Sequence, residues 1–333
     1  MIRNVLVTGG AGYVGAVLVP KLLRAGFLVT VFDTYWYGDV FNGIIDQSHL
    51  KQIKADLRDY PVIKQALTDI DVVIHLACIS NDPSFELNQN LGKSINYDAT
   101  IQLFDSAQKA GVRRFIYAST SSVYGIKKES EVTEDLTLEP LTDYSKYKAL
   151  SELELLKKSS ENFTTLVVRP ATVCGYSPRL RLDLTVNILT LHALVNNQIT
   201  VFGGSQLRPN IHIEDITDLY VKTLKFPDKQ INGKIFNVGY ENHSLQDIAE
   251  LVKKTLADPS ITIITKPTSD LRSYKISSAK IKQELGFMPI HTIADAIQDL
   301  QTAYRTGKIP DALTDDRYYN IKTMKKLAAK STL

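Results

Sequence analysis

An apolar run that ends in regularly spaced glycines constrains the fold of this chain more than any other feature. Residues 5–8 are aliphatic or β-branched, and Gly9, Gly12 and Gly15 follow them at intervals of three. This pattern predicts a strand that turns tightly into a helix, because glycine tolerates the turn and lets other backbone approach. Backbone N–H groups and the positive end of a helix then face one place, which suits a dinucleotide pyrophosphate. Tight strand-to-helix turns also use glycine for purely steric reasons, so this motif alone is weak evidence for a dinucleotide site.

The first half of the chain alternates short β-branched runs with longer amphipathic stretches. Strands are expected at residues 4–8, 28–32, 52–54, 72–75, 114–117 and 165–168. Helices are expected at residues 14–25, 60–67, 96–109 and 144–158. Strict alternation predicts an α/β fold, a doubly wound parallel Rossmann sheet with its site at the carboxyl ends of the strands.

After about residue 174 this rhythm changes, which predicts a smaller α/β lobe that binds the substrate. Its expected helices are 184–196, 245–255 and 279–285, and its expected strands are 199–202 and 261–264. A strand at 234–238 is expected to return to the main sheet. The predicted division assigns residues 1–173 and 213–241 to the dinucleotide half, and residues 174–212 and 242–333 to the second lobe. The charged, aromatic tail after residue 310 is either a packing arm or a frayed end, and its apolar positions favour the arm.

Composition excludes several classes of protein. The 333 residues are 44% hydrophobic and 23% charged, which is typical of a soluble globular protein. A net charge of +3 is too small to argue for nucleic acid. Cys78 and Cys174 lie far apart without metal-ligand spacing, so no metal site is expected, and two lone thiols favour a reducing compartment. With neither an export signal nor a membrane-spanning run, we expect a cytoplasmic enzyme without membrane partners.

An acidic residue after the second strand predicts the choice of dinucleotide. Asp33 lies about twenty residues beyond the glycine turn, where a carboxylate accepts hydrogen bonds from ribose hydroxyls and repels a 2′-phosphate. Residues 34–38 contain no Arg or Lys that would bind such a phosphate, so NAD is favoured over NADP. Asp56 either meets the adenine amino group or is an ordinary turn residue. His75 and Cys78, at the end of the fourth strand, are expected to be packing residues.

A tyrosine and a lysine four positions apart supply the second signal. Tyr144 and Lys148 fall on one face of the helix expected at 144–158. A free phenol has a pKa near 10, but a nearby ammonium and an oxidised nicotinamide both favour the phenolate. The pair can therefore move a proton beside the cofactor, whereas alone it would indicate only an amphipathic helix face.

These motifs occur in a fixed order along the chain. They are residues 8–15, Asp33, 75–77, Asn96, 119–125, Tyr144 with Lys148, and 169–175. The set resembles the extended short-chain dehydrogenase/reductase family, in its nucleotide-sugar epimerase/dehydratase branch, over about the first 300 residues. The resemblance implies that Tyr144 is the acid/base, that Lys148 binds the nicotinamide ribose, and that Thr120 provides the third catalytic hydroxyl. The residues expected at NAD are Gly9, Gly12, Tyr13, Val14, Gly15, Asp33, Asp56, Leu57, Leu76, Ala77, Cys78, Asn96, Tyr144, Lys148 and Pro170.

One departure from the family pattern bears on the reaction. Sugar dehydratases of this family carry Asp and Glu where this chain has Ser121 and Ser122. Without an acid and a base for elimination, the resemblance implies epimerisation of a nucleoside-diphosphate sugar, most plausibly at C4, through a keto-sugar. A dehydrogenase or ketoreductase that exchanges its cofactor is the first alternative. A non-catalytic NAD-binding sensor or scaffold is the second, although the tyrosine and lysine that such proteins commonly lose are intact here.

The resemblance also places the substrate. Arg208 and Arg272 match two family arginines that bind the diphosphate, for which guanidinium groups are well shaped, although either is also compatible with a solvated surface charge. Thr172 and Cys174 replace the usual Asn and Tyr, and residues 177–181 add positive charge nearby.

Two further features are predicted near the fourth strand and on the surface. Ser80 and Asn81 follow that strand and either recognise sugar hydroxyls or form a polar turn. The helices at 96–109 and 144–158 are expected to form a homodimer interface, as in the family.

Overall fold

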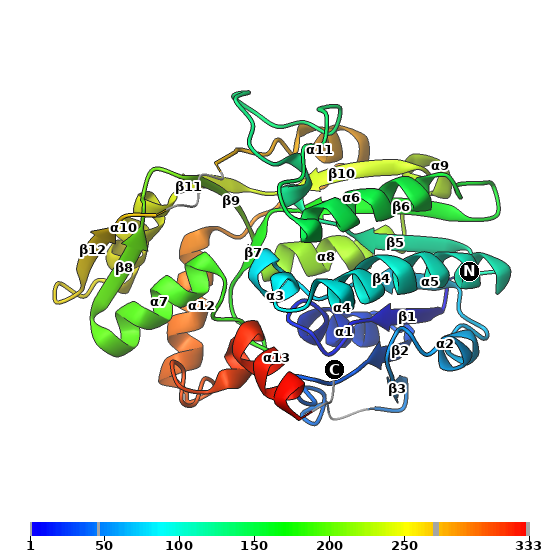
Figure 1. Ribbon diagram of the computed structural model, residues 1–333, viewed down its shortest axis with the longest axis horizontal. Coiled ribbons are helices and arrows are strands. Elements are labelled where there is room, and N and C mark those ends of the chain that lie inside the picture. The colour runs from blue at the N-terminus through cyan, green and yellow to red at the C-terminus, as the bar shows by residue number, and fades with distance from the viewer. Residues whose placement is uncertain (1, 45–46, 269–272, 331–333) are drawn as a thin grey trace.

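A seven-stranded parallel sheet lies at the centre of the computed structural model, which describes residues 2–44, 47–268 and 273–330 (Figure 1). The strand order is β3-β2-β1-β4-β5-β6-β10, and every pairing is parallel. These strands are β1 (Asn4–Thr8), β2 (Leu28–Asp33), β3 (Leu50–Lys54), β4 (Val72–His75), β5 (Arg114–Ala118), β6 (Thr164–Pro170) and β10 (Lys234–Val238). The direction of strand order reverses between β1 and β4, so a crevice opens at their carboxyl ends. The expected Rossmann fold is confirmed.

Helices cover both faces of this sheet, because its strands carry apolar side chains on both sides. Val5 and Val7 of β1 pack in one buried cluster with Leu18 and Leu219, while Leu6 packs in another with Phe104. The helices of this half are α1 (Gly15–Arg24), α2 (Tyr60–Ala66), α3 (Asp82–Glu86), α4 (Gln89–Lys93), α5 (Thr100–Lys109), α6 (Asp143–Leu156), α8 (Ile213–Thr223) and α9 (Asp228–Ile231). The helix α11 (Ala279–Leu285), which was expected in the second lobe, packs on β10 instead, with Ile281 buried in the core of the sheet half. Burial on both faces explains why the strands read as continuous hydrophobic runs.

The helix expected at 96–109 is not uniform. A π-helical segment, Ser94–Ala99, precedes α5, and the Thr100 hydroxyl donates to the carbonyl of Ile95 at 3.1 Å. Short π-helical insertions often occur next to functional sites. Here the insertion carries Asn96, which bonds to the loop that follows β4.

The second lobe lies to one side of the sheet (Figure 1). Its elements are α7 (Thr185–Asn196), β8 (Gln198–Phe202), α10 (Leu245–Leu256), β12 (Thr262–Lys266) and α12 (Ile293–Arg305). Between the lobe and the sheet lies a three-stranded sheet of β7 (Thr172–Cys174), β9 (Leu207–His212) and β11 (Glu241–Ser244), which the sequence analysis did not predict. β7 and β11 have only three and four residues, and β9 contains Pro209, which weakens its strand signal.

The C-terminal tail is a packed arm, as favoured above. It ends in α13 (Asn320–Ala329), which packs against α3, and Met324 is buried among side chains of the sheet half. The backbone N–H of Leu182 donates to the carbonyl of Tyr318 at 2.8 Å, so the arm is also tied to the second lobe. The arm therefore joins the two halves, and the domain boundaries stay a prediction. None of the helices described is long and apolar enough to cross a membrane.

Candidate active site

A cavity of about 510 Å³ opens at the carboxyl ends of β1, β2, β4, β5 and β6. Its opposite side consists of residues that follow β7, together with Arg208, Tyr274 and Asn320. The cavity therefore lies where the reversal in strand order predicts a ligand site.

The glycine turn forms one end of this cavity. Gly9 has a φ of +73°, and a Cβ there would lie 2.5 Å from the backbone nitrogen of Ala77. A Cβ on Gly15 would lie 2.2 Å from the carbonyl oxygen of Gly10. Both positions require glycine, so the turn packs directly on the end of β4. Residues from the turn and from the ends of β4 and β6 line the cavity: Gly9, Gly12, Tyr13, Val14, Gly15, Leu76, Ala77, Cys78 and Pro170. This cradle fits a dinucleotide pyrophosphate.

Two acidic side chains lie at the adenosine end expected from the sequence. The Asp33 carboxylate accepts backbone N–H bonds from Ala11 at 3.0 Å and Tyr35 at 2.8 Å, and its burial raises its pKa. The Asp56 carboxylate instead accepts two bonds from the Arg58 side chain, at 2.9 and 2.7 Å, as a turn residue would. Both aspartates, together with Leu57, line the cavity.

Residues behind the end of β4 hold it in place. His75 lies between the hydroxyls of Thr8, at 2.6 Å, and Thr100, at 3.1 Å, and its burial lowers its pKa to about 3. It is a neutral packing residue, as expected. Asn96 accepts from the N–H of Ile79 at 2.8 Å and donates to its carbonyl at 2.9 Å. Asn96 thus fixes the loop that lines the cavity.

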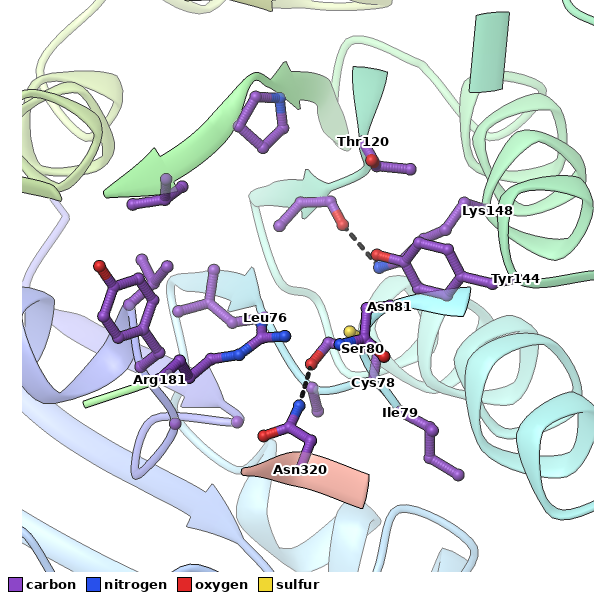
Figure 2. A pocket seen from close by; sticks show the side chains of 18 of the residues that line it. Leu76, Cys78, Ile79, Ser80, Asn81, Thr120, Tyr144, Lys148, Arg181 and Asn320 are labelled. Carbon is purple, nitrogen blue, oxygen red and sulfur yellow. Dashed lines mark hydrogen bonds between the residues drawn. The ribbon is translucent and has the colours of Figure 1, made fainter. Parts of the chain in front are cut away.

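Thr120, Tyr144 and Lys148 face the same cavity (Figure 2). The Lys148 side chain is buried, and its Nζ donates to the carbonyl of Ala118 at 2.8 Å. The Thr120 hydroxyl donates to Ser122 Oγ at 3.1 Å. Burial raises the pKa of Tyr144, and the Lys148 ammonium opposes that rise. The structure therefore brings together the three groups that the sequence identified as catalytic.

A buried ion pair holds α6 against the strands. Arg169 Nη2 of β6 contacts Glu152 Oε2 of α6 at 2.6 Å, and both side chains are almost completely buried. The Ser119 hydroxyl donates to Glu152, and Arg169 Nη1 donates to Tyr124 Oη at 2.6 Å. Because these contacts join β5, β6 and α6, they determine where Tyr144 stands relative to Thr120.

The residues predicted at the substrate are partly brought together. Ser80, Asn81, Thr172 and Arg208 line the cavity. Asn81 also caps α3 by accepting from the N–H of Ser84 at 3.0 Å, so its polar-turn role is real. Arg272 lies outside the described residues.

Several polar residues at the cavity were not identified as site residues from the sequence, among them Arg179, Arg181, Asp183 and Asn320. Arg181 forms a two-bond ion pair with Asp183, at 2.9 and 3.0 Å. The guanidinium of Arg179 lies 3.8 Å from the ring centroid of Tyr37. Residues 34–38 contain no Arg or Lys of their own, but the guanidinium of Arg179 reaches this segment from a distant part of the chain. Its only sequence signal was the charge noted at residues 177–181.

Comparison with known proteins agrees with this geometry. The model of the NAD dependent epimerase/dehydratase family matches residues 5–239. UDP-glucose 4-epimerase of Lactobacillus helveticus is 28% identical over 92% of this chain and 97% of its own length. UDP-glucuronic acid decarboxylase 1 of Arabidopsis thaliana is 28% identical over 91% of this chain and 70% of its own length.

A solved structure of an NAD-bound epimerase has a similar fold. UDP-glucuronic acid 4-epimerase from Bacillus cereus, in complex with UDP-glucuronic acid and NAD, superposes with a TM-score of 0.80. It is 25% identical, and the match covers 91% of this chain and 99% of that one. With the family model matching more than half of its length, the chain belongs to the NAD-dependent epimerase/dehydratase family and is an NAD-dependent enzyme.

Proposed function

We propose that this enzyme epimerises a nucleoside-diphosphate sugar at C4, by transient oxidation to a keto-sugar and reduction from the opposite face. One observation carries the proposal. Thr120, Tyr144 and Lys148 face a single cavity, and the two positions beside Thr120 that would serve elimination are the serines 121 and 122.

The side chains have separate roles in this proposal. Tyr144 takes the proton of the sugar hydroxyl and later returns one, while the Lys148 ammonium stabilises the phenolate. The Thr120 hydroxyl, which donates to Ser122 in this structure, would donate instead to the reacting oxygen and orient it when the sugar is bound. The glycine turn, Asp33 and Lys148 would hold NAD, which supplies the hydride acceptor and donor when bound.

Ser121 and Ser122 argue against dehydration. The Ser122 hydroxyl bonds to Thr120, and Ser121 Oγ lies 3.3 Å from Tyr274 Oη. Elimination of water needs a positioned acid and base, and neutral serine hydroxyls are poor at both tasks. Oxidation and reduction at one carbon need only the triad.

The names of the relatives guide the choice of substrate. Two are 4-epimerases of UDP-glucose and UDP-arabinose, and the Bacillus cereus protein binds UDP-glucuronic acid. We therefore place UDP-sugars first among the substrates to test. The homodimer through α5 and α6 stays a prediction, which light scattering of the purified protein would test.

The test is to incubate the purified enzyme with UDP-, GDP- and dTDP-sugars without added reductant, and to follow the sugar by NMR. Catalytic conversion to a C4 epimer with no net change in NADH absorbance supports the proposal. Product that forms only in proportion to added NAD or NADH contradicts it and indicates a dehydrogenase or ketoreductase. Release of carbon dioxide from UDP-glucuronic acid would instead indicate a decarboxylase.

A further inference from the structure

A segment of the second lobe, residues 175–187, packs directly on the glycine turn. The Ser177 hydroxyl donates to the carbonyl of Tyr13 at 2.8 Å, and Tyr13 Oη donates to the carbonyl of Gly175 at 2.7 Å. Asn187 Nδ2 donates to Tyr13 Oη at 3.1 Å. Tyr13 belongs to the turn itself, so this segment lies across the place where the pyrophosphate cradle opens.

Arg179 extends from this segment into the cavity. The residue is only 4% exposed, and its guanidinium stacks on Tyr37, which follows β2. Nη1 donates to the carbonyl of Leu180 at 3.2 Å, and Nη2 donates to Asn320 Oδ1. Among the described residues, Nε has no hydrogen-bond partner.

The charge of Arg179 is not neutralised by a bonded carboxylate. Its neighbour Arg181 forms an ion pair with Asp183, whereas Arg179 forms no ion pair with any carboxylate of the described residues. Burial lowers the pKa of Arg179 to about 10, so the guanidinium remains protonated at neutral pH. A buried cation with a free donor is costly unless an anion joins it.

We propose that Arg179 binds the pyrophosphate of NAD from the side opposite the glycine turn, and that Asn320 holds Arg179 in position from the C-terminal arm. A guanidinium matches phosphate oxygens in shape and charge. The glycine turn offers backbone N–H groups to one side of the anion, and Arg179 offers Nε to the other.

The C-terminal arm locks this arrangement. Asn320 accepts from Arg179 and donates through Nδ2 to Ser80 Oγ at 2.9 Å, so one side chain joins three distant segments. Figure 2 shows its bond to Ser80. Met324, four positions further, is buried in the sheet half. The arm thus contacts both halves at the edge of the cofactor crevice. If the proposed epimerisation is correct, NAD is regenerated in each cycle, and a closure that slows its release does not limit turnover.

The test measures NAD binding to protein stripped of cofactor, with no sugar present. Arg179→Gln should raise the Kd for NAD about 10- to 100-fold, because a charge-assisted hydrogen bond to a buried anion is lost. Binding of adenosine, which has no phosphate, should not change. Arg317→Gln is the matched control, because it removes the same guanidinium from the arm near Asn320, where the Arg317 side chain is largely exposed.

Variants of Asn320 test whether the C-terminal arm slows the release of NAD, rather than only stabilising the fold. Asn320→Ala should release NAD faster than the wild-type protein, as followed by NADH fluorescence after dilution. Asn320→Asp should also release NAD faster, because its carboxylate would neutralise the charge of Arg179 and cannot donate to Ser80. Arg179→Lys serves if the Gln variant does not fold, and should retain part of the affinity through its charge.

Two results would overturn the proposal. One is a Kd for NAD in a folded Arg179 variant equal to that of the Arg317 control. The other is a loss confined to nucleotide-sugar affinity, which would assign Arg179 to the substrate diphosphate. Failure of the epimerase proposal would leave these NAD measurements unchanged, so the two failures are distinguishable.

Discussion

The cavity has two walls that the chain builds in different ways. The first wall consists of the glycine turn, Thr120, and the Tyr144 and Lys148 side chains, each placed by a local pattern. The second wall consists of residues 172–185, Arg208 and Asn320. Its contacts join residues that are 164 positions apart, as for Ser177 and Tyr13, or 240 apart, as for Asn320 and Ser80. Local spacing and the family resemblance therefore predict the first wall. In the second wall the resemblance predicted only Thr172 and Arg208, and the folded chain reveals the rest.

The two walls also differ in chemistry. The first wall carries the Tyr144 hydroxyl, which can move a proton. It also carries backbone N–H groups, which cradle a phosphate, and the buried ammonium of Lys148. The second wall carries guanidinium groups, which bind anions but do not transfer protons at neutral pH. We therefore expect changes in the first wall to lower kcat, and changes in the second wall to weaken binding.

The largest expected effect is a fall in kcat when the first wall is changed. Tyr144→Phe keeps the ring but removes the proton path, so kcat should fall about 10²–10⁴-fold while NAD binding is retained. Steady-state assays and the NAD content of the purified variant measure the two quantities. Tyr147→Phe is the control, because Tyr147 lies on the same helix and stacks on Phe85. Near-normal kcat in the Tyr144→Phe enzyme would assign the proton transfer to another group.

Much of the fold was predictable because burial on both faces leaves a continuous apolar signal. The strand expected at 72–75 matches β4, and the strand expected at 234–238 matches β10. The strands β7, β9 and β11 carry no such signal, because β7 and β11 have only three and four residues and β9 is interrupted by Pro209. Arg179 and Asn320 were missed because a lone polar residue gives no sign of which cavity it will reach.

The second expected effect concerns the ion pair that aligns the first wall. Glu152→Ala leaves Arg169 buried without its partner and removes the acceptor of Ser119, so the free energy of unfolding should fall by about 3–5 kcal/mol. Urea unfolding of the stripped protein measures this loss. Glu154→Ala is the matched control, because Glu154 lies on the same helix in an exposed ion pair with Lys157. Equal losses in the two variants would contradict a special role for the buried pair.

The third expected effect is on the second wall. Arg208, on β9, lines the cavity. Arg208→Ala should weaken nucleotide-sugar binding by about 1.5–3 kcal/mol, because a charge-assisted bond to the diphosphate is lost. Calorimetric titration with UDP-sugars measures the change, and NAD affinity should stay constant. The exposed Arg305→Ala serves as control, and a loss of NAD affinity alone would move Arg208 from the substrate to the cofactor.

The smallest expected effect is on the free energy of unfolding, and it concerns an ion pair behind the second wall. Unlike the pair of Arg181 with Asp183, this pair contains a histidine, so its charge depends on pH. His291 Nδ1 donates to Asp215 Oδ1 at 2.8 Å, with side-chain exposures of 35% and 4%. Burial opposes the charge on His291, but the bond to Asp215 outweighs it, so the pKa of His291 is raised above 6.5. A raised pKa in the folded chain means that the stabilisation is complete below pH 6.5 and is lost as the pH rises through the folded value.

His291→Gln should therefore lower the free energy of unfolding at pH 5.5 by less than about 1 kcal/mol, since the pair is partly exposed. The difference from the wild-type protein should shrink towards pH 8.5. His192→Gln tests the sign, because burial lowers the pKa of His192 and its removal should become relatively favourable as the pH falls. Urea unfolding at both pH values measures each difference. A His291 effect that grows with pH would show that the imidazole contributes in its neutral form, and would contradict stabilisation by the charged pair.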